Sequence, residues 1–123
     1  MTLMIDTAGK GLAMILKDYQ EEALRFIWEN KGDGASSRDV WNYANKALKT
    51  KTISRASIIN FLNAMVDEGV LVYIEITGKG GHRRIYSTKL NEAEFKKHIV
   101  ETVLKNLMRD FSSETKEVLR NFR

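Results

Sequence analysis

The sequence predicts a mainly α-helical fold that carries one small antiparallel β-hairpin, and three observations support this. Apolar residues recur with the 3.6-residue period of helices before residue 69 and again after residue 91. Between these segments the period changes to two, which is the spacing of a strand. A glycine-rich turn at residues 78–81 then separates two runs of strand type. The length of 123 residues suffices for one domain with a single core and an appended helix.

Residues 1–15 are predicted to form an N-terminal arm, because Gly9 and Gly11 disfavour regular structure there. The apolar run from Leu12 to Leu16 either begins a helix or packs as a short arm. Gly9-Lys10-Gly11 lacks both the Walker spacing and the Ser or Thr that follows the lysine of a phosphate-binding loop. The arm therefore carries no motif that indicates a function.

The first predicted helix begins at Asp18, with Glu21 as the capping-box partner three residues later. Its apolar residues fall on one stripe that continues to about Lys31, and Gly32-Asp33-Gly34 ends it. We interpret Trp28 as a core residue, since an isolated Trp at helical spacing is usually packed.

The second predicted helix begins at a cap supplied by Ser36 or Ser37 and runs to about Leu48. Trp41 lies on its apolar side and is likewise interpreted as core. A bridge from Lys49 to Ile53 follows, and Thr52-Ile53 is a candidate for a short additional strand.

The third predicted helix, from the Ser54 cap to the Gly69 stop, has two contrasting sides. One arc holds the apolar residues Ile58, Ile59, Phe61, Leu62, Met65 and Val66. The opposite arc holds small uncharged residues, namely Ala56, Ser57, Asn60, Asn63 and Ala64. A merely solvated face more often carries Lys and Glu. This side therefore indicates a helix that lies flat against a polar surface such as the major groove of DNA.

The predicted hairpin starts after Gly69, where Val70, Val72, Ile74 and Ile76 alternate with other residues. Its second strand returns over residues 84–89. The tip between the strands carries cations and a histidine, namely Lys79, His82, Arg83 and Arg84. Such a wing can set guanidinium groups against phosphate or in a minor groove. A glycine-rich loop can also cradle a nucleotide, but no helix N-terminus follows this one to hold a phosphate.

The last predicted helix begins at an Asn91 cap with Glu94 as the capping-box partner. Its apolar residues span nearly half the circumference, and a shorter amphipathic helix follows from Glu114 to Phe122. At 1.5 Å per residue the long helix extends about 28 Å, comparable to a domain diameter. We therefore expect a second chain to cover it, although it can alternatively pack back onto its own domain. The predicted dimer interface comprises Phe95, Ile99, Val103, Leu107, Phe111 and Leu119.

The order helix, helix, bridge, helix, hairpin, long helix is that of a winged helix-turn-helix with a C-terminal dimerisation helix. It divides the chain into the arm at 1–15, the winged helix-turn-helix at 16–90 and a helical dimerisation region at 91–123.

The net charge of +4 is concentrated in two segments. Residues 49–66 and 76–91 contain no Asp or Glu. Together they hold seven of the 20 basic residues, which leaves 13 against 16 acidic residues elsewhere. Two basic segments on an otherwise mildly acidic body are typical of a protein that binds nucleic acid.

Four segments of the chain resemble the penicillinase-repressor family of winged-helix regulators, over about Leu16 to Arg120. They are ALRFIWENKG, SRASIINFLNAMVDEGVL, the strand ending RRIYS and the tail LMRDFSSETKEVLR. The resemblance implies a homodimer that binds a partly palindromic operator on double-stranded DNA and blocks transcription. It places the recognition positions on Ala56, Ser57, Asn60 and Asn63, and the basic wing on Lys79 to Arg84.

The family also implies modes of induction that this chain matches incompletely. Antibiotic-responsive members are cleaved at an Asn-Phe bond in the dimerisation region, and the matching position here is Asp110-Phe111. Copper-responsive members use a C-terminal cysteine motif, whereas this chain contains no cysteine. The inducing signal is therefore unknown.

The expected function is sequence-specific DNA binding. Base contacts are assigned to the recognition helix residues Arg55, Ala56, Ser57, Asn60 and Asn63. Phosphate contacts are assigned to Lys49, Lys51, Lys79, His82, Arg83 and Arg84. The alternative is a winged-helix module that binds proteins instead of DNA.

An enzyme is the least favoured class, because His82 and His98 have no evident nucleophile or carboxylate arrangement around them. Two scattered histidines do not make a metal site, so we expect neither a metal nor a cofactor. The absence of cysteine suits a cytoplasmic protein, and no run approaches the ~20 apolar residues that span a bilayer.

Overall fold

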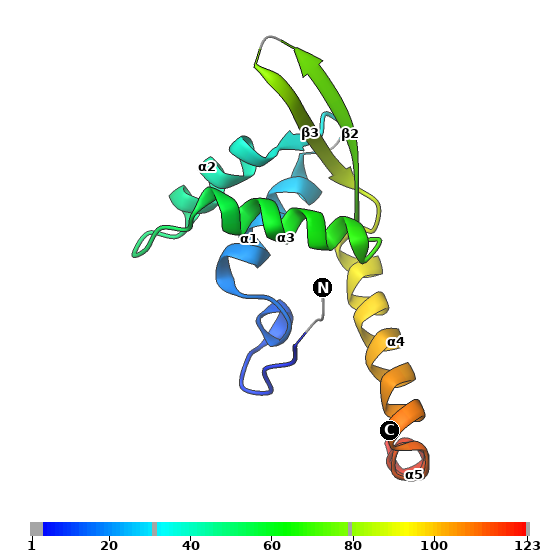
Figure 1. Ribbon diagram of the computed structural model, residues 1–123. Coiled ribbons are helices and arrows are strands. Elements are labelled where there is room, and N and C mark those ends of the chain that lie inside the picture. Colours follow the sequence, from blue (N-terminus) through cyan, green and yellow to red (C-terminus); the bar gives the residue numbers. More distant parts are fainter. Residues whose placement is uncertain (1–3, 31, 79, 123) are drawn as a thin grey trace. The chain divides into compact units, whose positions relative to one another are not determined.

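The computed structural model describes residues 4–30, 32–78 and 80–122, and the chain forms two compact units, Met1–Asn91 and Glu92–Arg123. The elements of the first unit are a 3₁₀ turn at Gly11–Met14, α1 at Asp18–Glu29, β1 at Ala35–Ser36, α2 at Ser37–Ala47, α3 at Arg55–Asp67, β2 at Leu71–Gly78 and β3 at Gly81–Thr88. The second unit comprises α4 at Glu92–Asp110 and α5 at Ser112–Asn121 (Figure 1). The predicted mainly helical fold with an antiparallel hairpin is confirmed.

The core of the first unit forms where the apolar stripes of α1, α2 and α3 meet, because each helix is apolar on one side only. Its fully buried members include Leu24, Ile27, Val40, Ile58, Leu62 and Met65. The two tryptophans lie at its margin, where each indole N–H donates to a backbone carbonyl. Trp28 Nε1 donates to Leu90 O at 3.0 Å, and Trp41 Nε1 donates to Ile53 O at 2.8 Å.

Helix α1 begins at Asp18 as predicted, but its cap lies one residue before the predicted one. Lys17 is the N-cap residue, and its backbone N–H donates to the Gln20 side chain at 2.9 Å. Asp18 is already helical, and its carboxylate accepts the Tyr19 N–H at 2.7 Å. The predicted pairing of Asp18 with Glu21 is therefore wrong, because Gln20 occupies the third position after the true cap.

The caps of α2 and α3 are as predicted. The Ser36 hydroxyl accepts the Asp39 N–H at 3.2 Å, and the Ser54 hydroxyl accepts the Ser57 N–H at 3.1 Å. Helix α3 ends at Asp67, and Gly69, two residues later, has a φ of +79°. This left-handed residue lets the Val70 N–H reach Met65 O at 2.9 Å and turns the chain into β2.

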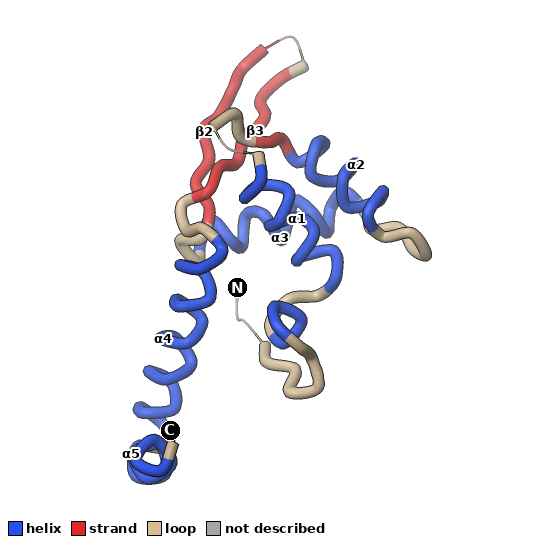
Figure 2. Tube along the Cα trace, turned by 180° about the vertical axis from the view of Figure 1, so that it is seen from behind, coloured by secondary structure: helices blue, strands red, loops and turns tan. Residues whose placement is uncertain are grey.

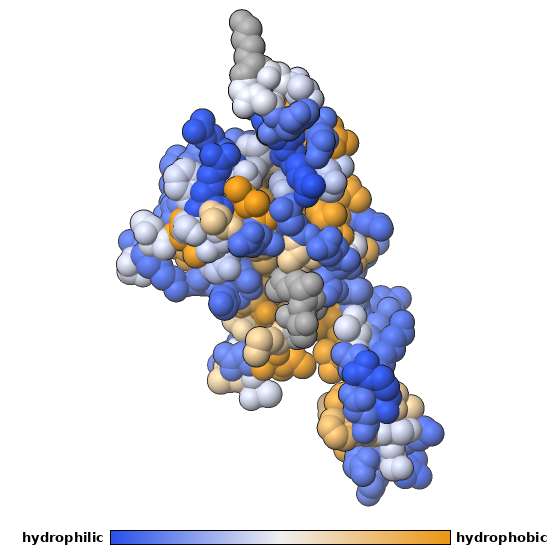
Figure 3. All heavy atoms as spheres, viewed as in Figure 1, coloured by the Kyte–Doolittle hydropathy of each residue, from blue (hydrophilic) through white to orange (hydrophobic). Residues whose placement is uncertain are grey.

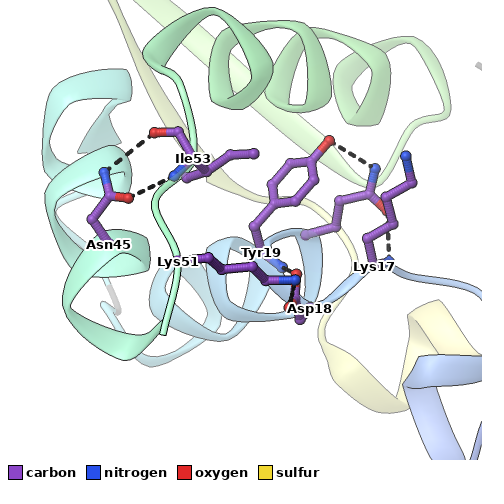
Figure 4. A network of polar contacts seen from close by, with 7 residues as sticks. Lys17, Asp18, Tyr19, Asn45, Lys51 and Ile53 are labelled. Carbon is purple, nitrogen blue, oxygen red and sulfur yellow. Dashed lines mark hydrogen bonds and ion pairs between the residues drawn. The ribbon is translucent and has the colours of Figure 1, made fainter. Parts of the chain in front are cut away.

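The sheet has three strands in the order β1-β3-β2, all antiparallel (Figure 2). The third strand is Ala35–Ser36 and not the predicted Thr52-Ile53. Gly34 allows this pairing, since a Cβ there would lie 2.6 Å from Cγ2 of Ile85 on β3. Ile53 makes its backbone bonds elsewhere, because its N–H donates to the Asn45 side chain at 2.8 Å (Figure 4).

In the second unit, α4 starts directly after Asn91, and α5 starts two residues before the predicted Glu114. The break falls on Phe111, whose φ and ψ of −135° and 56° are not helical. The buried hydroxyl of Thr115 closes the bend by donating to Phe111 O at 2.6 Å. Among the described residues, no helix is long and apolar enough to cross a membrane.

Candidate nucleic-acid interface

The predicted reading side of α3 is open only along its N-terminal half. Ala56, Asn60 and Asn63 follow one another at helical spacing and share this side of the helix. Arg55, Ala56 and Asn60 are exposed. Ser57 is half-buried, and its hydroxyl lies 2.9 Å from that of Ser54. The N-terminal half of α3 therefore presents a bare, acid-free polar surface.

Asn63, at the other end of this stripe, is engaged by the hairpin. Its Oδ1 accepts the Tyr86 hydroxyl at 2.6 Å and Nη1 of Arg84 at 3.0 Å. Burial raises the pKa of the Tyr86 hydroxyl, which therefore stays protonated and donates. A bidentate contact with adenine needs this same oxygen, so Asn63 does not share the open surface of Asn60.

Arg84, predicted to contact phosphate, is also held by the protein. Its guanidinium carbon lies 4.0 Å above the Tyr73 ring, and its Nε lies 3.7 Å from a carboxylate oxygen of Glu75. Arg83 and His82 are exposed on the hairpin, and His82 Nδ1 lies 3.1 Å from the Thr77 hydroxyl. Lys79 lies outside the described residues. Of the two arginines on β3, Arg83 is therefore the one whose side chain is exposed to solvent.

A hollow of about 650 Å³ lies beside the hairpin, next to the N-termini of α2 and α3. Arg38, Arg55 and Arg83 line it, with Asp39 as the acidic member. Strongly hydrophilic side chains gather on the hairpin and over the helices beside it on the face seen in Figure 3. These three arginines converge from three elements and form an anion-attracting surface, which we call the arginine groove.

Sequence reasoning missed Arg38, although one signal was present. Arg38 occupies the first turn of α2, where the helix dipole disfavours a cation. A cation in that position contributes little to helix stability, which is itself an indication of another role. The sequence does not place Arg38 next to Arg55 and Arg83. The three residues come together because β3 of the hairpin packs against α2.

A sequence model described as penicillinase repressor matches residues 16–122, nearly the whole chain. The chain belongs to the penicillinase repressor family. This confirms the resemblance found from the sequence. The family consists of transcriptional regulators, which are not enzymes.

No curated protein matches the chain. Among solved structures, the chain is similar to the Orc1 protein of Aeropyrum pernix in complex with DNA. The two share 14% sequence identity with a TM-score of 0.56, and the match covers 70% of this chain. The penicillinase-repressor chain spans only 24% of that protein, so the likeness shows a shared fold.

The two lysines of the bridge differ in their surroundings in this repressor-family structure. Lys49 is exposed, whereas Lys51 forms an ion pair with Asp18 at the start of α1 (Figure 4). The hydrogen bond from Lys51 lowers the pKa of the Asp18 carboxyl. Lys49 is therefore freer than Lys51 to contact a phosphate.

The Asp18–Lys51 pair predicts a small acid-dependent stability term. A carboxyl whose pKa is lowered on folding contributes stability above its unfolded pKa of 3.8 and loses it as pH falls through the folded value. We expect Asp18→Asn to be slightly less stable than the wild type at pH 7. The difference should shrink as the pH falls below 3.8 and approach zero toward about pH 2. Urea unfolding at the two pH values measures it, and a difference that persists at low pH would contradict this assignment.

The second unit of the penicillinase-repressor chain exposes an apolar surface, part of which is visible in Figure 3. Phe95 and Ile99, two residues predicted at the dimer interface, are only 0% and 8% exposed in the single chain. They therefore do not form part of this exposed apolar surface. Val103 is half-buried, and Leu107, Phe111 and Leu119 are exposed. Val118 and Phe122, near the end of the chain, are exposed at 59% and 77%.

Among the described residues, no three His, Cys, Asp or Glu side chains gather as metal ligands do.

Proposed function

We propose that this penicillinase-repressor chain binds double-stranded DNA sequence-specifically as a homodimer and represses transcription from a pseudo-palindromic operator. One observation carries the proposal: the open half of α3 begins at Arg55, which lines the arginine groove, and residues 49–66 contain no acid. A helix that enters a major groove needs this combination of a small polar reading face and flanking positive charge.

Phosphate contacts supply the affinity. Arg38, Arg55 and Arg83 line one groove at the N-terminal end of α3, where they can contact the DNA backbone, and the exposed Lys49 lies on the preceding bridge. Each neutralised phosphate releases counterions, so the affinity falls as salt rises. Because every sequence has the same backbone, these contacts position the protein without specifying a base pair.

Asn60 and Ser57 supply the base readout. The exposed Asn60 amide can donate to N7 and accept from N6 of one adenine, and Ser57 can contact various base edges. Two recognition helices related by a dimer axis would meet half-sites about 34 Å apart, one turn of the duplex. The Orc1 relative in fold was solved in complex with DNA, which is consistent with this use of the fold.

The proposed function is tested by measuring the affinity of the full chain for duplexes selected from random sequence, at two salt concentrations. We expect tighter binding to the selected duplex than to mixed DNA, and weaker binding to both at high salt. Failure to bind either duplex would leave the protein-binding module as the explanation of the fold.

Asn60→Ala should relax the preference at one or two base pairs by about 1–3 kcal/mol and leave binding to mixed DNA unchanged. Competition titrations with duplexes substituted one base pair at a time measure this. A uniform loss on all duplexes would show that Asn60 does not read a base.

A further inference from the structure

The wing, defined as β2 and β3 with their turn, needs an anchor to keep a fixed direction. The third strand is only two residues long, and its pairs reach no further along β3 than Ser36 opposite Ile85. From Ile85 to the tip, the wing is a two-stranded hairpin. Such hairpins are marginally stable in water unless something packs against one face.

One face of the wing carries four side chains from two cross-strand pairs. Tyr73 is opposite Tyr86, and Glu75 is opposite Arg84, so all four project to the same side. The Tyr73 and Tyr86 rings are 6.2 Å apart, and Arg84 lies over Tyr73. Tyr86 is 2% exposed. These contacts bring a hydroxyl and a guanidinium to the foot of the wing.

Both donors converge on one atom of α3, the Oδ1 of Asn63, at 2.6 Å and 3.0 Å. An amide oxygen has two lone pairs, so the two donors satisfy it fully. Asn63 lies three residues after Asn60 on the same side of the same helix. One oxygen therefore connects the phosphate-contacting element to the base-reading element.

We propose that Asn63 is a positioning residue, which fixes the wing relative to α3 so that the arginine groove and the reading face meet one duplex together. This role replaces the direct adenine contact expected from the sequence. Arg84 and Tyr86 act with it, and Arg84 contributes through the anchor and not through a phosphate. The proposal rests on the DNA-binding function proposed above.

The first test uses the full chain without DNA. Asn63→Ala and Tyr86→Phe should each speed hydrogen exchange of the wing amides about 3- to 10-fold, the range that one net hydrogen bond supplies. The double variant should be no worse than the more affected single variant, because both remove the same bond. Asn63→Asp keeps an acceptor oxygen and should retain slow exchange. Additive effects, or unchanged exchange in all variants, would overturn the anchor.

The second test measures DNA binding of the same variants, with Asn60→Ala as the matched control. Asn63→Ala should weaken binding to all duplexes by a common factor and flatten the salt dependence, because the wing no longer holds its cation in place. Asn60→Ala should change neither wing exchange nor the salt slope. If Asn63→Ala instead loses preference at one or two base pairs with an unchanged salt slope, Asn63 is a base reader. If the wild type binds no DNA, the proposed function fails while the exchange test still decides the anchor.

Discussion

Replacing Arg55 and Arg83 together by alanine should lower the affinity for every DNA sequence on the order of 100-fold. Both side chains are exposed, both line the arginine groove, and they come from different elements. If each contacts one phosphate, the slope of log affinity against log salt should become shallower by about 1.8. Fluorescence anisotropy at several salt concentrations measures the affinity and the slope.

The matched control is Lys10→Ala with Lys46→Ala, which removes the same net charge from two other exposed positions of the same unit. Its loss should be small, because general attraction between exposed charges is screened over about 10 Å at 0.1 M salt. Equal losses in the two double variants would mean that net charge, and not the arginine groove, holds the DNA.

The second large effect is expected from Leu107→Glu on α4. Leu107 is 36% exposed in the single chain, so a glutamate there is tolerated by the monomer. In a dimer that buries this surface, the carboxylate would lose its water and weaken association about 100-fold or more. Sedimentation velocity should show monomers at micromolar concentration, and operator affinity should fall with dimerisation while the helical circular dichroism is retained.

Asn106→Glu provides the control, since it adds a charge at the adjacent exposed position without removing apolar surface. It should remain dimeric and bind the operator. A dimeric Leu107→Glu variant would exclude this side of α4 from the interface. The dimer contact would then be assigned to Phe111 and α5.

Local chemistry made much of the fold predictable. The caps at Ser36 and Ser54 and the stop at Gly69 depend on groups within a few residues of each helix end. The change from helical to strand period after Gly69 likewise needs no distant partner. These signals placed the wing and the third helix correctly.

Long-range contacts were not predictable in the same way. The strand at Ala35–Ser36 forms because it meets β3 about 50 residues later, and its two residues are too few to show a period. From its sequence, Ile53 was an equally good strand candidate. In the structure its N–H donates to the Asn45 side chain and its carbonyl accepts the Trp41 indole N–H, so these groups do not pair with a strand. Phe95 and Ile99 looked like the other apolar residues of α4, and only their burial distinguishes them.

The candidate site shows the same division. The sequence by itself determined a cationic, acid-free recognition helix followed by a wing, because residue type and period suffice for that. Only the tertiary structure decided that the Asn60 side chain is exposed while the Asn63 side chain is hydrogen-bonded within the protein. The two asparagines lie on one side of one helix, and the sequence does not distinguish them. The difference arises because a hairpin more than 20 residues away donates hydrogen bonds to Asn63. A side chain's chemistry is local, but its availability depends on what the rest of the chain brings against it.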